Sequence, residues 1–291
     1  MTIRTAYAGL PHVHGFIDWL ASELDSQTLF KHQYIDRRSG VRWSCASLHE
    51  AYLGYAWNHP GNQRLGFNPG TTAQSNDDAL AALRGDLLAA GDDDERMLRA
   101  TRDVMAWGGV SARNGKWLES NKDGLARKVQ QVRTALLAKD PQAAVLRAGS
   151  LRFNSGMTKV YSLLCPDFVI YDSRVAAGLG LLVVRYCMAK GLNQVPEGLN
   201  FPWAGAKEGE NTTEPKNRNP SVGGLRFKRL RSGGHHARWN MNASWVLSQV
   251  AAHVACAESP LRAGKTPAQT LRALEQALFM VGYDLGEVTI R

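Results

Sequence analysis

The sequence predicts a mostly α-helical protein, and three observations lead to this fold class. From residue 77 onward, apolar residues recur at helical spacing and several of these runs end at glycines. Alternating stretches of the kind that form strands are scarce. With 44% hydrophobic and 21% charged residues among 291, the composition is that of a globular chain with a sizeable core.

Residues 1–76 are the first predicted domain, an irregular, aromatic-rich region packed on the core. Its end, from residue 58 on, is dense in Pro, Gly and Asn, so a loop is expected there. The sequence predicts short helices over 14–24 and 46–57, and its two strand candidates are 34–43 and, at the far end of the chain, 288–290.

Residues 77–291 are predicted to be one helical domain. Within it, residues 192–234 form a different kind of segment, 43 residues long, rich in Pro, Gly and polar residues and without a sustained period. Structureless loops of this length are usually functional or disordered. Because it holds little apolar material, we expect 208–220 to be removable without loss of the fold. The expected helices cover 77–90, 93–107, 125–138, a short piece after Pro141, 157–164, 172–190, 242–257 and a last helix capped by Thr266 with Pro267 and Gln269.

The composition argues against several classes of protein. The most apolar run, 175–188, contains Arg185 and two glycines, so no membrane-spanning helix and no membrane partner are expected. The first residues lack the pattern of a secretory signal, which favours a cytoplasmic protein. The four cysteines include no C-x-x-C pair, which argues against a zinc site, an iron–sulfur cluster or a disulfide scaffold. A metal site is not expected at His235 and His236, since adjacent histidines rarely converge on one ion.

The positive charge is concentrated in the middle of the chain. Residues 113–240 hold 21 Lys and Arg against 9 Asp and Glu, whereas the rest of the chain holds 14 against 17. A basic stretch is often only a solvated surface. The size of this excess favours a polyanion as the partner, and nucleic acid in particular.

The most informative run is 152–175, RFNSGMTKVYSLLCPDFVIYDSRV. It begins with a tight polar turn at 154–156 before a short helix that carries Lys159. A connection through Pro166 and an apolar stretch lead to Asp172, at the start of a long helix. A turn with free N–H groups beside a helix N-terminus is suited to a phosphate. A lysine that faces a carboxylate is a candidate amine nucleophile.

This order of features resembles the helix–hairpin–helix DNA glycosylases, in particular the 8-oxoguanine DNA glycosylase branch. In that branch a hairpin of the form G-x-G-T-K-V delivers the catalytic lysine, and a catalytic aspartate follows after a short apolar approach. The resemblance is strongest over about 25 residues and looser over roughly 100–260. The matching residues are Gly156, Thr158, Lys159 and Val160, with Met157 as one extra residue, and Asp172 at the aspartate.

The resemblance implies a helix–hairpin–helix glycosylase-like helical bundle with its hairpin at 150–160, acting on double-stranded DNA as a monomer. It also implies that the reaction requires no metal and no organic cofactor. Lys159 would attack the sugar C1′ as a neutral amine and form a Schiff base, which permits strand cleavage, while Asp172 would stabilise the developing positive charge. The implied DNA-binding residues are Arg152, Asn154, Ser155, Gly156, Thr158 and Arg174, and the candidates for the base pocket are Phe153, Tyr171, His235, Trp239 and Trp245.

Each of these residues also has a structural explanation. Asp172 is a good N-cap for the helix that follows, lysines on short helices usually face solvent, and tryptophans are more often core than stacking surface. The substrate stays open between a damaged base, in repair, and a bulky modified pyrimidine of phage DNA, in antiviral defence. A non-catalytic helical DNA-binding protein is the alternative, and the need for a primary amine at Lys159 distinguishes the two.

Overall fold

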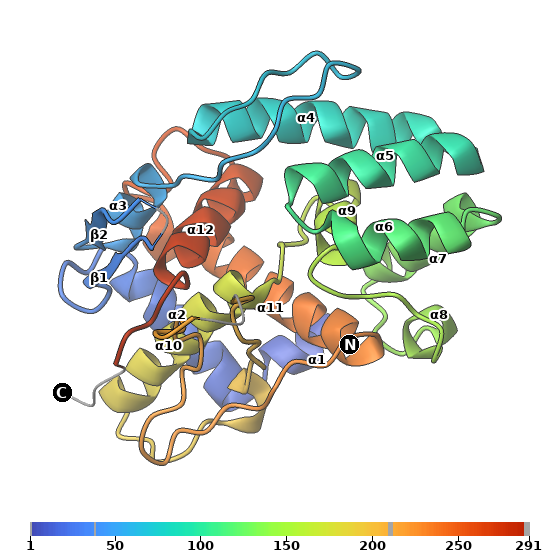
Figure 1. Ribbon diagram of the computed structural model, residues 1–291. Coiled ribbons are helices and arrows are strands. Elements are labelled where there is room, and N and C mark those ends of the chain that lie inside the picture. The colour runs from blue at the N-terminus through green and yellow to red at the C-terminus, as the bar shows by residue number, and fades with distance from the viewer. Residues whose placement is uncertain (1, 38, 209–211, 288–291) are drawn as a thin grey trace. The chain divides into compact units, whose positions relative to one another are not determined.

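The computed structural model describes residues 2–37, 39–208 and 212–287, and these are mostly helical, as predicted (Figure 1). One two-stranded antiparallel sheet is present among the described residues, formed by β1 (His32–Ile35) and β2 (Arg42–Cys45). The helices are α1 (Ile3–Ala8), α2 (Pro11–Glu23), α3 (Leu48–Leu53), α4 (Ala73–Ala90), α5 (Asp94–Trp107), α6 (Ser111–Ser120), α7 (Leu125–Leu137), α8 (Ala144–Arg147), α9 (Met157–Leu164), α10 (Ser173–Ala189), α11 (Gly234–Ala252) and α12 (Pro267–Val281).

The strongest periodic patterns predicted their helices well, and the differences have physical reasons. The predicted strand 34–43 is a hairpin, in which β1 and β2 flank a turn. The helix α6 was missed because it buries only Asn114 and Leu118 and so shows little periodicity. The helix α11 begins eight residues before the predicted residue 242, since His236, Ala237 and Asn240 are buried. The predicted strand 288–290 lies outside the described residues.

By their internal contacts, the described residues form two compact units. Unit 1 combines residues 1–55, 171–231 and 242–291, and unit 2 combines 56–170 and 232–241. The chain therefore enters unit 1 three times, and α11 begins in unit 2 and ends in unit 1. The predicted domain boundary at residue 76 stays a prediction.

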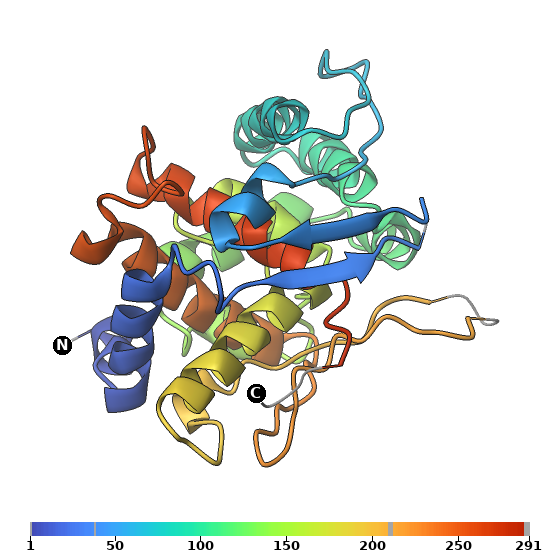
Figure 2. The ribbon, with the colours of Figure 1, turned by 90° about the vertical axis from the view of Figure 1, so that its left-hand side faces the viewer.

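Unit 1 is built around the close approach of α10 to α12. A Cβ added at Gly178 would lie 2.5 Å from the carbonyl oxygen of Leu278, so only glycine permits this spacing. The β-hairpin of β1 and β2 lies beside α12 together with α3 (Figure 2). Aromatic side chains complete the packing, and Tyr34 stacks both on Trp43 at 4.8 Å and on Tyr283 at 4.6 Å between ring centroids. The aromatic residues of the first part of the chain thus contribute to this core.

Unit 2 has α4 and α5 side by side, with α9 packed against both (Figure 1). Hydrogen bonds connect the start of α4 to the end of α5: the Trp57 ring donates to the Trp107 carbonyl, the Trp107 ring to Asn76, and the Asn76 amide to the Trp57 carbonyl. The Arg84 side chain of α4 donates to the Leu163 carbonyl of α9. These contacts fix the helix that carries Lys159 within its unit.

The long segment 192–234 is anchored at many points, which corrects the expectation that part of it is removable. Arg218 is only 7% exposed and donates to the Ser173 hydroxyl, and Pro220 packs where a Cβ at Gly180 would lie. Asn217 donates its backbone N–H to Asp284. Deleting 208–220 would therefore remove contacts with α10 and with Asp284, which follows α12. Other residues of the segment, with His12, line a hollow of about 710 Å³.

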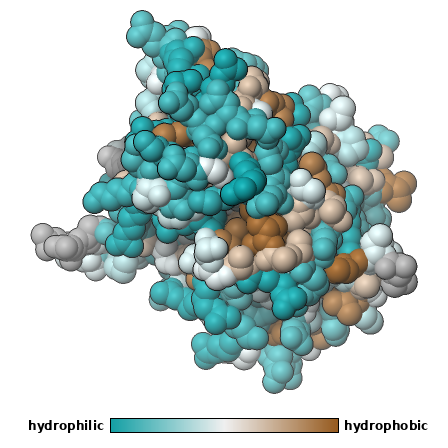
Figure 3. Space-filling view, turned by 90° about the vertical axis from the view of Figure 1, so that its right-hand side faces the viewer, coloured by the Kyte–Doolittle hydropathy of each residue, from teal (hydrophilic) through white to brown (hydrophobic). Residues whose placement is uncertain are grey.

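Within the described residues, no helix is both long and apolar enough to cross a bilayer. On the face shown in Figure 3, hydrophilic residues predominate and hydrophobic ones gather in small patches.

Replacing Gly178 with alanine should destabilise the protein by about 1–3 kcal/mol, because the new methyl group forces α10 away from α12. The control is Gly85→Ala in the middle of α4, where nothing lies within 4 Å of the added Cβ. That change should stabilise by about 0.5–1 kcal/mol. Urea and thermal unfolding measure both effects, and a Gly178→Ala variant as stable as the native chain would contradict the close approach.

Candidate functional site

The candidate hairpin of unit 2 lies between α8 and α9 and is held by its own asparagine. The Asn154 carboxamide oxygen accepts from the backbone N–H groups of Gly156 and Met157 at 2.9 and 3.0 Å, and the Asn154 carbonyl accepts from Thr158 N. The side chain thereby satisfies two N–H groups at the start of α9, which would otherwise lack partners. The predicted polar turn at 154–156 has this physical basis.

Asn114 of α6 connects the hairpin to the rest of unit 2. Its oxygen accepts from Arg152 at 3.1 Å and from Asn154 at 2.9 Å, while its NH₂ group donates to the Val110 carbonyl at 3.0 Å. A Cβ at Gly156 would lie 2.2 Å from the Asn114 nitrogen, so this glycine is required for the contact. Asn114 is 7% exposed.

Lys159 is a buried lysine, 5% exposed, on the first turn of the hairpin's helix. Its ammonium or amine nitrogen lies 3.0 Å from the Ser155 carbonyl oxygen, to which it donates. Its carbon stem lies against Gly108, where an added Cβ would be 2.4 Å from Cδ and 2.7 Å from Cε. The glycine pair at 108–109 is therefore more than the end of α5, because its first member makes room for the lysine.

The start of α11 also supports the hairpin. Thr158 donates its hydroxyl to Asn240, whose NH₂ group donates to the Val169 carbonyl. Gly233, at φ +77°, donates its N–H to the Phe153 carbonyl, and a Cβ at Gly234 would lie 2.4 Å from the Leu146 carbonyl oxygen. Gly233 therefore serves a close approach to the hairpin, and Gly234 a close approach of α11 to α8.

Asp172 belongs to unit 1 and caps α10. Its Oδ1 accepts from the backbone N–H groups of Arg174 at 2.9 Å and Val175 at 3.2 Å, and the residue is 9% exposed. The capping role expected from the sequence is confirmed. A catalytic role for this carboxylate stays a prediction.

The surroundings of Asp172 within unit 1 are cationic. The guanidinium of Arg174 lies over the rings of Phe279 and Tyr283, at 4.3 and 4.7 Å from their centroids. Burial, together with the positive charge of Arg174, lowers the pKa of the buried Arg218, and the charge of Asp172 acts in the opposite direction. Arg174, predicted to bind DNA, thus has an aromatic environment in this structure.

The candidates for the base pocket are mainly interior side chains. Phe153 and Tyr171 are fully buried, and Trp245 is 5% exposed. Phe153 stacks on Tyr161 of unit 2, while the Tyr171 hydroxyl donates to the Pro202 carbonyl in unit 1. His235 and Trp239 are half-buried on α11. A stacking role for any of them stays a prediction, and for Phe153, Tyr171 and Trp245 it requires a change of packing.

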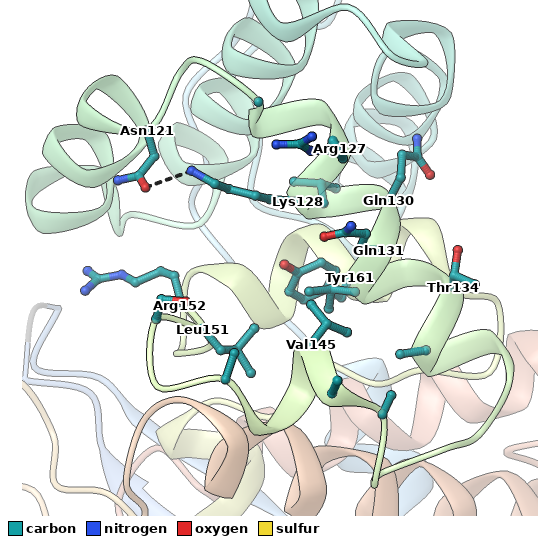
Figure 4. Close-up of a pocket in the computed structure, with 18 of the residues that line it drawn as sticks. Asn121, Arg127, Lys128, Gln130, Gln131, Thr134, Val145, Leu151, Arg152 and Tyr161 are labelled. Carbon is teal, nitrogen blue, oxygen red and sulfur yellow. Dashed lines mark hydrogen bonds between the residues drawn. The ribbon is translucent and has the colours of Figure 1, made fainter.

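A cavity of about 1480 Å³ lies in unit 2 beside the hairpin (Figure 4). One end carries Arg127, Lys128 and Arg152, and Lys128 donates to Asn121 at 3.1 Å. Its lining also includes Asp92, Asp94 and Asp140, which balance the three cations. Hydrogen bonds from the N–H groups of Ala126 and Gly124 lower the pKa of Asp94, so that it carries its charge. The charge of this cavity does not favour a polyanion over other ligands.

The four cysteines are buried and unpaired with one another. Burial raises the pKa of Cys165 to about 12 and that of Cys45 to about 11, which keeps these thiols protonated near neutral pH. Among the described residues, no group of three or more His, Cys, Asp or Glu side chains is arranged to hold a metal ion.

No family model, no curated protein and no solved structure matches this chain.

Several residues of the site were missed by reasoning from the sequence, and all of them act through contacts between distant segments. Asn114, Gly108 and Asn240 reach the hairpin from α6, from the end of α5 and from α11. The available signals were the adjacent glycines at 108–109 and 233–234, which mark close backbone approaches as well as helix ends. Asn114 carried no such signal.

Replacing Asn114 with alanine should destabilise unit 2 by about 1–3 kcal/mol, because buried donors of Arg152 and Asn154 lose their acceptor. The matched control is Asn58→Ala at an exposed position of the same unit, which should change stability by less than about 0.5 kcal/mol. Chemical unfolding measures both. Equal stabilities of the two variants would show that the hairpin does not depend on Asn114.

Proposed function

We propose that this protein is a DNA glycosylase, which flips a damaged or modified base out of the duplex and breaks its N-glycosyl bond. The observation that carries the proposal is the construction around Lys159: a polar hairpin, capped by Asn154, precedes the short helix on which this lysine is buried. A lysine that merely bound phosphate would need no such enclosure, since exposed side chains serve that purpose. The resemblance of residues 152–175 to the glycosylase hairpin supports the same conclusion.

In the proposed reaction, Lys159 Nζ attacks C1′ of the flipped nucleotide as a neutral amine. The C1′–N bond breaks, and its electron pair leaves with the base, which takes up a proton. The nitrogen loses its proton, the sugar ring opens, and a protonated Schiff base forms between Lys159 and C1′. Hydrolysis by water then returns the lysine and leaves an abasic site, while elimination of the 3′ phosphate would instead cleave the strand.

Asp172 has the role of an electrostatic partner in this proposal. A carboxylate stabilises positive charge that develops on the sugar as the glycosidic bond lengthens. Capping of α10 holds the carboxylate in a defined orientation, because Oδ1 receives two backbone N–H groups. Structural and chemical roles are therefore compatible in one residue.

With a substrate duplex and borohydride, the native protein should become covalently trapped on DNA, because a Schiff base at Lys159 is reducible. Lys159→Gln should lose trapping while retaining DNA affinity, since one cation among many is a small part of the electrostatic attraction. Lys122→Gln, at an exposed lysine of the same unit, is the control and should trap normally. The native protein and both variants are tested on a panel of substrates, which contains duplexes with oxidised bases and phage DNA with glucosylated pyrimidines. The released base is measured for each substrate.

Asp172→Asn should keep the melting temperature nearly unchanged, because asparagine caps a helix about as well as aspartate. It should lower the excision rate at least about a hundredfold, because the amide carries no negative charge. Asp93→Asn, the same change at the N-cap of α5, should leave excision unaffected. Native excision by Asp172→Asn would remove the carboxylate from the mechanism. Duplex binding with no base released from any substrate would favour the non-catalytic DNA-binding protein.

Gly108→Ala should lower excision and trapping at least about tenfold, because the added Cβ lies within 2.7 Å of Lys159 Cε and displaces the amine. Gly115→Ala in α6 is the control, since nothing lies within 4 Å of its Cβ, and it should excise normally. Native trapping by Gly108→Ala would show that the position of the lysine stem is unimportant to the reaction.

A further inference from the structure

The strongest charge asymmetry in the chain lies within unit 1 and the start of α11. Residues 215–257 contain seven Lys and Arg residues and not one Asp or Glu. Four of the seven are concentrated in the run LRFKRLR at 225–231. A dense group of cations without acidic neighbours in sequence is costly in self-repulsion unless an anion offsets it.

The run 225–231 is held in an extended form that separates its apolar from its cationic side chains. Leu225 and Phe227 are buried, at 4% and 8% exposure, whereas Arg226 and Lys228 between and after them are exposed. This alternation is that of a strand with one buried face. The core therefore fixes the backbone over 225–228, and Arg226 and Lys228 remain on the solvent side.

The backbone of this run is further fixed by Asn200, whose side chain makes hydrogen bonds of the kind that a neighbouring strand would make. Its NH₂ group donates to the Arg226 carbonyl at 2.9 Å, and its oxygen accepts from Lys228 N at 3.0 Å. Trp203 continues the pairing: its N–H donates to the Lys228 carbonyl, and its carbonyl accepts from Leu230 N. The exposed cations thus project from an ordered backbone, not from a freely moving loop.

Arg229 is oriented by an aromatic ring. Its guanidinium lies 4.2 Å from the centroid of the Trp203 ring, a cation–π contact that restricts the side chain while leaving it exposed. Arg226, Lys228 and Arg229 therefore form a fixed set of exposed cations, which we call the basic strip. Arg226 and Lys228 are two residues apart, which corresponds to about 6.6 Å along an extended chain. This spacing is close to the rise along the helix axis over two phosphates of one B-DNA strand, about 6.8 Å.

We propose that the basic strip is a docking surface for the phosphate backbone of duplex DNA, and that it contacts about three phosphates of one strand. This inference rests on the proposed function, because it supplies the strand contacts of the same substrate. It adds residues outside the hairpin and outside the proposed chemistry. Phosphate contacts position a protein on DNA without reading sequence, which suits an enzyme that recognises one base in any context.

The test is the salt dependence of binding to an unmodified duplex, measured by fluorescence anisotropy. Each phosphate contact adds about 0.9 to the slope of log affinity against log salt. The triple variant Arg226→Gln, Lys228→Gln, Arg229→Gln should lower this slope by about 2–3. The control removes the same charge from three exposed positions on other elements of unit 1, with Lys31→Gln, Arg42→Gln and Lys190→Gln, and should lower the slope by less than about 1.

Single variants keep the result independent of the fold, since Arg226→Gln and Lys228→Gln change exposed side chains only, and each should lower the slope by about 0.9. Equal slopes for the basic-strip triple variant and the control would overturn the proposal. It would also be overturned if the triple variant lost binding to anionic phosphatidylserine vesicles but kept the native slope on DNA. The salt dependence of binding is measured without base excision, so the two proposals can fail separately. Native trapping, with an unchanged slope in the triple variant, would refute the role of the basic strip alone. A lowered slope in the triple variant, without base release by the native protein, would refute the glycosylase alone.

Discussion

The candidate hairpin depends on the hydrogen bonds that it makes to the buried carboxamide of Asn114. One oxygen accepts from two side chains of the hairpin, and the neighbouring nitrogen fills the space that Gly156 leaves open. Asn154 is held from both sides, because its oxygen caps α9 within the hairpin while its NH₂ group donates to Asn114. Because α5, α6 and α11 all contact this one turn and its helix, the position of Lys159 is set by the packing of unit 2 as a whole. In the proposed reaction, an amine held in this way would lose little freedom on reaching the transition state.

The two proposed catalytic groups are held by different kinds of contact. This difference determines how the structural role of each group can be separated from its chemical role. Lys159 is placed by packing: its stem lies against Gly108 and its nitrogen against the Ser155 carbonyl. Asp172 is placed by a helix cap, in which two N–H groups meet one oxygen. An uncharged substitute retains the cap but not the charge, so stability and chemistry report on different properties of the same side chain. For a lysine fixed by packing, a change at a neighbour such as Gly108 tests its position separately from its amine.

The sequence predicted those parts of the fold whose signal is local. The helix α9, the N-caps of α10 and α12 and the polar turn at 154–156 depend on residues within a few positions of one another. The helix α6 was not predicted because its buried face is made of one asparagine and one leucine. The early start of α11 was hidden by the glycine pair at 233–234, whose role is a close approach to α8 and the hairpin, far away in the sequence. Contacts of this kind leave no periodic pattern.

The same distinction applies to charge. An excess of 12 positive charges over residues 113–240 favours a polyanionic partner, but the formal count treats all cations alike. Arg218 is buried against Ser173, Arg174 lies over two rings, and Arg152 is bonded to Asn114. These side chains would have to give up protein contacts before meeting a phosphate, whereas Arg226 and Lys228 would not. A cation already in water can neutralise a phosphate, and release the counterion condensed on the DNA, without such a cost. Burial therefore determines where along the basic region a duplex would be held, and it selects the run in which exposed cations alternate with buried apolar residues.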